Sequence, residues 1–248
     1  MKIGICLAGG GAKGSYEAGV IRALFDKNIK FTSISGTSIG AINGYYIYTS
    51  NIDKLSDIWM NVNEISKNGL NIKNNTIDND IILNELSKLN NNNVNNNINF
   101  YVNYVKVQDG NLNENIVNIN KLSKEEQLNS IKYSSLLPFN PQSKLNFREQ
   151  FKKDLKEGLY NGFNLDGGLI NNELLLPLIK ENLDKIVLIT MKHDYILPDY
   201  IKNIYDENNI ILVRPKTIFE KNDTFKFEQE FCTRMYKEGY EIGKGINI

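Results

Sequence analysis

Short apolar runs alternate with stretches of helical periodicity along most of this chain. Residues 2–8 (KIGICLA) form a compact apolar run, three glycines follow, and apolar side chains then recur at helical spacing up to Phe25. The run IKFTSISG at 29–36 and the stretch SIGAINGYYIYT at 38–49 repeat this order. Strands that alternate with helices favour a parallel sheet, so the pattern predicts an α/β fold with helices on both faces.

The same alternation returns in the last third of the chain. We expect a helix over 171–183, strands over 184–191 and 209–215, and a final helix over 224–245. We find no internal repeat. The whole chain, 1–248, is therefore interpreted as a single domain.

The middle of the chain differs in composition. Residues 61–130 are crowded with Asn, most densely at 90–99, and such a tract is a candidate for disorder. However, INFYVNYVKV at 98–107 has strong β character, and Ser123 with Glu126 forms a capping box that predicts a helix to Leu137. We interpret about 61–130 as an ordered excursion from the domain, and its Asn surplus as a compositional bias without a chemical role.

Charge and cysteine content exclude several classes of protein. The chain has 29 basic and 29 acidic residues, which argues against nucleic-acid binding. No apolar run approaches the roughly 20 residues of a transmembrane helix. The apolar N-terminal run stops after Ala8 at glycines, which favours a buried strand over a signal peptide. Two cysteines, Cys6 and Cys232, make no disulfide framework. A cytoplasmic protein is the expectation.

The residues Gly9–Gly14 spell G-x-G-x-x-G, the turn that cradles a dinucleotide pyrophosphate. A dinucleotide site also requires an acidic residue at the end of the second strand, where it binds the ribose hydroxyls. That predicted strand ends in Ser35 and Gly36. A nucleotide-binding domain is therefore only an alternative.

Two further motifs contain residues suited to catalysis. Gly36, Thr37, Ser38, Ile39 and Gly40 form G-x-S-x-G between a predicted strand and a predicted helix. This is the setting of a nucleophile elbow, a strained turn that exposes its serine. The alternative is a serine that only caps the helix. The second motif is the D-G-G at Asp166–Gly168, which in isolation indicates a turn or a helix cap.

Together, and in this order, the three motifs resemble those of the patatin-like phospholipases, a family of serine acyl hydrolases. The family pattern is a G-G-G-x-[RK]-G loop, a G-x-S-x-G elbow and a later D-G-[GA]. YSSLLPFNP at 133–141 and EGYEIGKG at 238–245 resemble further family segments. The resemblance spans nearly the whole chain except the Asn-rich middle. It implies a patatin-like three-layer α/β/α fold with a mainly parallel central sheet.

The resemblance also implies a mechanism with two catalytic residues. Ser38 is the expected nucleophile and Asp166 the expected base, which needs burial to raise its pKa toward neutrality. The bare amides of the glycine loop are expected to stabilise the charge that develops on the substrate carbonyl. The residues implied for this oxyanion hole are Gly9, Gly10, Gly11, Ala12, Lys13 and Gly14, and Gly167 and Gly168 complete the D-G-G motif.

The chain departs from the family pattern at three places. Lys13 stands where Arg is more frequent, so a bidentate contact is lost. The gap between Pro141 and Asp166 is long and contains FREQFKKDLKEGL at 147–159, which predicts an added amphipathic helix. Glu173 and Leu174 replace a frequent x-Pro. These departures affect substrate fit and leave both expected catalytic groups in place.

His193 keeps a second mechanism open. Ser38, Asp166 and His193 follow one another in the chain order of an α/β-hydrolase triad, and His193 follows a predicted strand. We interpret its surroundings as a polar loop and favour the dyad. One His and two distant Cys provide no zinc spacing, so no metal and no cofactor is expected.

The expected substrate, implied by the resemblance, is an acyl ester of a phospholipid or another lipid. GYYIYT at 44–49 and LLPF at 136–139 are candidates for an acyl channel, and FKKDLKEGL at 151–159 is a candidate for transient contact with a membrane surface. The remaining alternative is an inactive lipid- or protein-binding module on the same fold. The sequence does not indicate an oligomeric state.

Overall fold

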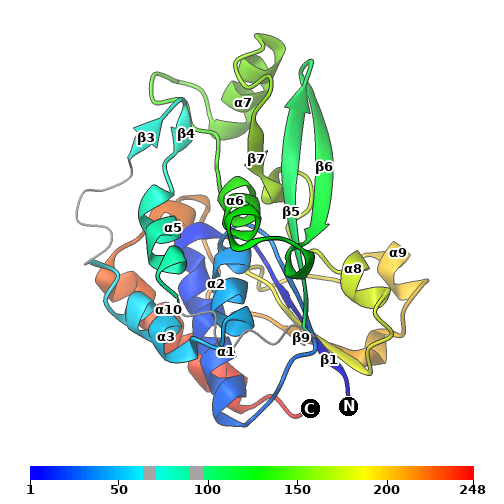
Figure 1. Cartoon of the computed structure of the whole chain (residues 1–248). Helices are drawn as coiled ribbons and strands as arrows, with labels where there is room; N and C mark the ends of the chain where they lie inside the picture. Colours follow the sequence, from blue (N-terminus) through cyan, green and yellow to red (C-terminus); the bar gives the residue numbers. More distant parts are fainter. Residues whose placement is uncertain (64–70, 90–97) are drawn as a thin grey trace.

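The computed structural model describes residues 1–63, 71–89 and 98–248. Its central sheet has the strand order β6-β5-β2-β1-β8-β9, with β7 also paired to β5 (Figure 1). The pairs among β5, β2, β1, β8 and β9 are parallel, whereas β6 and β7 run antiparallel to β5. The strands are β1 (Ile3–Leu7), β2 (Ser33–Gly36), β5 (Asn99–Gln108), β6 (Asn111–Asn118), β7 (Asn164–Asp166), β8 (Lys185–Ile189) and β9 (Ile210–Val213).

Helices connect these strands and cover the sheet, and a small separate hairpin is formed by β3 (Ile72–Lys73) and β4 (Thr76–Ile77). The helices are α1 (Gly14–Asp26), α2 (Ile39–Tyr48), α3 (Ile52–Met60), α5 (Asp80–Ser87), α6 (Lys124–Ser134), α7 (Phe147–Lys156), α8 (Leu176–Ile179), α9 (Asp199–Lys202) and α10 (Gln229–Lys244).

Alternate residues of the central strands pack on opposite faces of the sheet. Ile5 and Leu7 of β1 belong to the large core that also contains α1, α2, α3 and α10, whereas Cys6 packs with the smaller core around α8 and α9. This period of two, in strands that are apolar throughout, is what a sheet covered on both faces requires. The predicted three-layer α/β fold with a mainly parallel central sheet is confirmed, and the α8–α9 layer is the thinner one (Figure 1).

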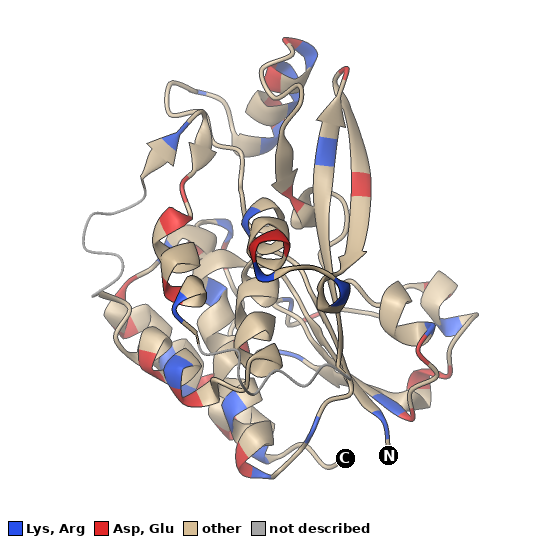
Figure 2. Ribbon diagram, in the orientation of Figure 1, with Lys and Arg blue, Asp and Glu red and all other residues tan. Residues whose placement is uncertain are grey.

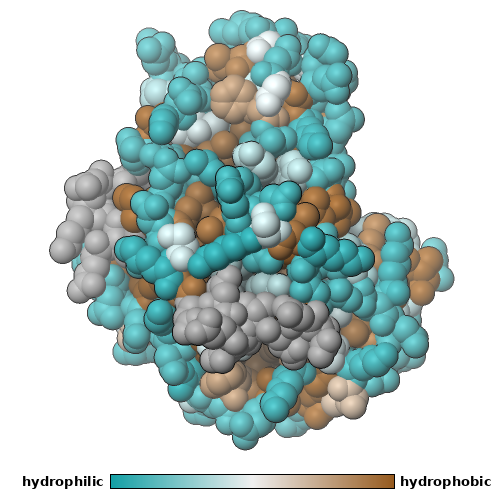
Figure 3. All heavy atoms as spheres, in the orientation of Figure 1, coloured by the Kyte–Doolittle hydropathy of each residue, from teal (hydrophilic) through white to brown (hydrophobic). Residues whose placement is uncertain are grey.

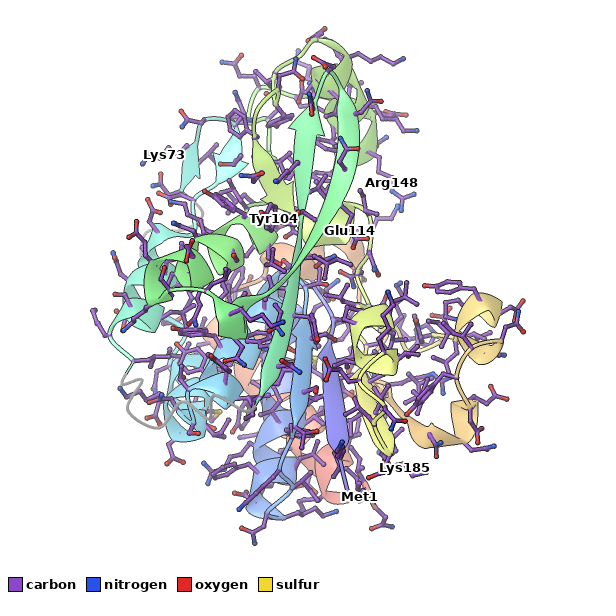
Figure 4. The ribbon with its side chains drawn as sticks, turned by 45° about the vertical axis from the view of Figure 1, so that its right-hand side comes forward. Met1, Lys73, Tyr104, Glu114, Arg148 and Lys185 are labelled. Carbon is purple, nitrogen blue, oxygen red and sulfur yellow. The ribbon has the colours of Figure 1, made fainter. Side chains whose placement is uncertain are left out.

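The strands β5 and β6 form a long hairpin that extends beyond the rest of the sheet. Its turn is Asp109-Gly110, and both residues have a positive φ, 50° and 72°, as a tight hairpin turn requires. Figure 4 shows Tyr104 and Glu114 on this hairpin, far from Met1 and Lys185 at the other end of the sheet. The expected β character of 98–107 is thus confirmed, and the hairpin brings part of the Asn-rich region into the central sheet.

Several element boundaries differ from the expectations. The helix expected over 171–183 is wrong for most of its length, because only α8 (Leu176–Ile179) is helical there. Pro177 explains this, since proline is tolerated in the first turn of a helix and breaks its interior. The capping box at Ser123 and Glu126 is present, but α6 ends at Ser134, before Leu137. Residues 90–97 of the densest Asn tract lie outside the described residues.

The two cysteines are free and buried, as expected for Cys6 in the core. Among the described residues, no helix combines the length and the apolar character needed to span a membrane.

Candidate active site

Ser38 lies in a strained turn between β2 and α2. Its φ is 56° and its ψ is −122°, a backbone conformation that costs a non-glycine residue on the order of 1–3 kcal/mol. Gly36 and Gly40 make the turn sterically possible, because a Cβ on Gly36 would lie 2.6 Å from the Gly40 carbonyl oxygen, and one on Gly40 would lie 2.3 Å from that of Leu7. The strand–turn–helix context predicted for an elbow is therefore present.

Asp166 lies at the end of β7 and faces the serine. The Ser38 hydroxyl donates a hydrogen bond of 2.5 Å to Asp166 Oδ2, across 128 positions of sequence. The other carboxylate oxygen, Oδ1, accepts a 2.8 Å hydrogen bond from the Gly168 N–H. The structure thus brings the two residues of the expected dyad into direct contact, and the D-G-G turn orients the carboxylate.

Strand β5 aligns these two residues. Because β6 pairs with β5 from Tyr101 to Gln108, β2 and β7 must share its other edge. Gly36 at the end of β2 is the partner of Val102, and Asp166 at the end of β7 is the partner of Tyr104. Strands β2 and β7 therefore run toward each other along the same edge of β5, and their ends lie two residues apart. The chain that follows Gly36 consequently lies beside Asp166.

The electrostatic environment of Asp166 favours its neutral form. Its side chain is only 4% exposed, and burial raises its pKa from 3.8 to about 6, while hydrogen bonds from Ser38 and Gly168 oppose the rise. A carboxyl group in this range can take up a proton near neutral pH far better than an ordinary aspartate.

The glycine loop lies against the serine. A Cβ on Gly9 would come within 3.0 Å of the Ser38 Cβ, and Gly11 has a φ of 58°. In the described part of the chain, the N–H groups of Gly10 and Gly11 donate to no other residue. Both residues line the same cavity as Ser38. Gly10 and Gly11 therefore line the cavity at Ser38 without an acceptor for their N–H groups in the described part of the chain, and α1 begins directly after the loop.

Lys13 of the same loop also lines the cavity. Burial lowers the pKa of its ammonium group, which lies 5.8 Å from the centre of the Phe219 ring. Among the described residues, no cluster of His, Cys, Asp or Glu could hold a metal ion.

The cavity has a volume of about 680 Å³ and extends from Ser38 and Asp166 into apolar surroundings. Its apolar wall comes from α2, α3, α5 and the segment after α6, through Ile39, Ile42, Tyr46, Leu55, Ile58, Trp59, Ile81, Ile82 and Leu137. Of the two expected channel segments, 44–49 therefore contributes Tyr46 and 136–139 contributes Leu137, whereas Tyr45 and Tyr48 do not line the cavity.

His193 lies apart from this site. Its ring is 41% exposed, and its Nδ1 lies 3.8 Å from Asp194 Oδ1. It is not among the residues that line the cavity. Within the described ranges, no hydrogen bond joins it to Ser38 or Asp166, whose polar contacts are already accounted for. The structure does not bring the third member of the alternative triad to the other two.

Three residues that sequence reasoning missed hold the site together. Ser134 of α6 accepts a hydrogen bond of 2.9 Å from the Ser38 N–H. Asn172 donates a hydrogen bond of 3.2 Å to the Gly9 carbonyl and so ties the D-G-G segment to the glycine loop. Asn103, fully buried on β5, accepts a hydrogen bond of 2.8 Å from the Thr37 hydroxyl. One asparagine of the Asn-rich region thus has a structural role at the site.

The fold and this geometry define an α/β protein with a hydrogen-bonded serine–aspartate pair, whose serine lies in a strained turn between a strand and a helix. The chain belongs to the patatin-like phospholipase family, which matches residues 5–179. The family suggested by the three motifs is thereby confirmed.

Curated relatives match a shorter stretch. A putative patatin-like phospholipase domain-containing protein of Caenorhabditis elegans is 50% identical over 42 residues, which are 17% of this chain and 4% of that protein. The lysophospholipase nte1 of Aspergillus terreus is 52% identical over 42 residues, which are 17% of this chain and 3% of the relative. The aligned stretch is thus a small part of much longer proteins.

Solved structures resemble the chain over nearly its full length. VipD from Legionella pneumophila matches with a TM-score of 0.52 at 14% identity, over 98% of this chain and 66% of that one. The type III effector ExoU matches with a TM-score of 0.52 at 12% identity, over 98% of this chain and 52% of that one. At such low identity the likeness supports the shared fold.

Proposed function

We propose that this chain is a lipid acyl hydrolase that cleaves acyl esters of phospholipids or other lipids through an acyl-Ser38 intermediate. The observation that carries the proposal is the 2.5 Å hydrogen bond from Ser38 to Asp166 at one end of an apolar cavity. Membership in the patatin-like phospholipase family supports the lipid substrate.

In the proposed reaction, Asp166 takes the proton of the Ser38 hydroxyl as the oxygen attacks the ester carbonyl. The negative charge that develops on the carbonyl oxygen meets the N–H groups of Gly10 and Gly11. One such donor contributes about 3–4 kcal/mol to lowering the barrier. The alcohol then leaves with a proton from Asp166, which next activates a water molecule that hydrolyses the acyl-enzyme.

The rest of the glycine loop supports this arrangement. Gly9 allows the loop to approach Ser38, and Ala12, Lys13 and Gly14 lead into α1, whose positive N-terminal end lies toward the same side. The ammonium group of Lys13 adds a positive charge at the cavity. The apolar wall along α2, α3 and α5 would hold the acyl chain of the substrate.

A fluorophosphonate probe tests the nucleophile directly. We expect the wild-type protein to be labelled and the Ser38→Ala variant to remain unlabelled. Hydrolysis of a panel of phospholipids and simple esters, compared between wild type and Asp166→Asn, then tests the base and the substrate class. Folded wild-type protein that takes up no label would contradict the proposal and favour an inactive binding module.

A further inference from the structure

The cavity opens beside an exposed segment with both apolar and basic side chains. Phe147 and Arg148, in the first turn of α7, line the cavity although both are exposed, so they mark its open end. Phe147 is 41% exposed, and Leu145, just before the helix, is 49% exposed. Across the opening, Ile81 of α5 is a second exposed apolar residue that lines the cavity.

Helix α7 is anchored from its inner side. Phe151 is buried in the core cluster with Tyr160 and Leu165. Asp154 is also buried and accepts hydrogen bonds from Gln150 and Asn140. The helix is therefore anchored through its second and third turns, and its outer face remains open to solvent.

The outer face has an excess of positive charge. Between residues 144 and 156 the chain has five basic side chains, Lys144, Arg148, Lys152, Lys153 and Lys156, and two acidic ones, Glu149 and the buried Asp154. Within the described ranges, Lys144, Arg148, Lys152 and Lys156 take part in no ion pair. Figure 2 shows basic and acidic positions on α7 at the top of the view, and Figure 4 labels Arg148 beside the β5–β6 hairpin.

On the opposite side of the opening, Asp80 is paired with two lysines. Asp80 of α5 forms ion pairs with Lys132 at 2.6 Å and with Lys73 at 3.8 Å. Asp78 and Glu228 also line the cavity and form no ion pair within the described ranges, so the excess of positive charge is confined to the α7 side of the opening. Figure 3 shows apolar side chains scattered among polar ones over the upper part of the molecule, where Figure 1 places α7.

We propose that residues 144–156 form a docking surface for an anionic lipid bilayer, with Leu145 and Phe147 entering the headgroup region and the basic side chains contacting lipid phosphates. Exposed apolar groups beside unpaired cations are the combination that binds such an interface. The docked surface would place the cavity opening on the bilayer, so that an acyl chain could pass toward Ser38 without crossing water. The proposal rests on the proposed function for its purpose, although the docking itself needs no catalysis.

Vesicle binding by the full chain tests the proposal. The probes are vesicles of phosphatidylcholine alone and vesicles with added phosphatidylglycerol. We expect preferential binding to the anionic vesicles, and weaker binding as salt is raised. The double variant Lys152→Gln/Lys156→Gln should lose about 25-fold in partitioning, since each basic residue near an anionic surface contributes about fivefold. Leu145→Ser should lose about fivefold.

The matched controls lie away from the opening. Lys237→Gln on α10 removes an exposed charge, and Ile196→Ser removes a side chain that is 73% exposed before α9. Both should bind vesicles like wild type. Leu145, Lys152 and Lys156 do not line the cavity, so their variants should hydrolyse a soluble ester at the wild-type rate. Equal binding by the α7 variants and wild type would overturn the proposal, as would equal binding to neutral and anionic vesicles or no vesicle binding.

The Ser38→Ala variant separates this proposal from the proposed function. It should bind anionic vesicles like wild type while hydrolysing nothing. Vesicle binding that depends on α7 in a protein that hydrolyses no ester would refute the proposed function and leave the docking surface standing. Ester hydrolysis in a protein whose vesicle binding is unchanged by the α7 substitutions would refute the docking surface and leave the proposed function standing.

Discussion

Asn103 accepts a hydrogen bond from Thr37 at 2.8 Å and donates one to the Asn171 carbonyl at 2.9 Å. It lies on β5 between Val102, the partner of β2, and Tyr104, the partner of β7. The same side chain leaves no room for a side chain at position 167, because a Cβ on Gly167 would lie 2.4 Å from Asn103 Oδ1. One buried amide therefore joins the turn that contains Ser38 to the segment that follows Asp166.

We predict that Asn103→Ala lowers kcat on a soluble ester by about 10–100-fold while KM changes little, because small displacements of reacting groups have effects of this size. The variant should also lose about 1–3 kcal/mol of stability, since buried partners are left unsatisfied. Steady-state kinetics and thermal unfolding measure both. Asn113→Ala, at an exposed position of the same hairpin, is the control and should match wild type. An unchanged kcat in Asn103→Ala would show that the amide does not position the site.

Asp166 should reduce the stability of the protein at neutral pH. Its pKa is about 6 in the folded state, against an ordinary value of 3.8. Between these values the unfolded chain has lost the proton while the folded protein keeps it, so stability falls as the pH rises through this window, by up to about 3 kcal/mol. Asp166→Asn removes this cost. We predict a higher Tm than wild type at pH 7.5 and no such gain at pH 3.5. A lower Tm at pH 7.5 would contradict the raised pKa.

The same raised pKa predicts the pH dependence of activity. A base must be ionised to accept the Ser38 proton, so kcat/KM should fall about tenfold per pH unit below about pH 6. An ordinary aspartate would keep activity down to about pH 4. A pH–rate profile on a soluble ester, within the range where the protein stays folded, distinguishes the two. A plateau that continues to pH 4.5 would count against Asp166 as the base.

The central sheet and the elbow were predictable because their signals are local. From β1 to α2 the sequence contains apolar runs of strand length, glycine turns and stretches of helical periodicity. Each of these elements is determined by local backbone geometry. The family resemblance then pointed to the pairing of Ser38 with Asp166. Asp109-Gly110 is a further local signal, because this dipeptide favours a tight hairpin turn.

The supporting residues could not be predicted in this way. Asn103 is one of many asparagines, and only the register of β5 between β2 and β7 distinguishes it from its neighbours. Ser134 and Asn172 reach the site through tertiary contacts that their spacing in the sequence does not predict. At 171–183 the apolar residues have helical periodicity, but Pro177 limits the helix to Leu176–Ile179.

His193 should be dispensable for the chemistry. Its ring is 41% exposed and is not part of the cavity wall. We predict that His193→Gln keeps kcat/KM on a soluble ester within about twofold of wild type, whereas loss of a general base typically costs 10²–10⁴-fold. A loss of several orders of magnitude in the folded variant would replace the dyad with a Ser–His–Asp triad.

The glycine loop yields a prediction in which backbone strain can be separated from lost catalysis. Gly11 has a φ of 58°, and a Cβ there would lie 2.1 Å from the backbone oxygen of Thr224, so Gly11→Ala must move the loop. We expect kcat to fall about 10²–10³-fold, the effect of losing one oxyanion donor.

Gly162 also has a positive φ, 84°, but nothing lies within 4 Å of a Cβ added there. Gly162→Ala should therefore incur the backbone strain, about 1 kcal/mol of stability, and keep the wild-type kcat. A similar loss of kcat in both variants would show that strain alone is responsible, and it would remove the argument that the N–H groups of the loop stabilise the oxyanion.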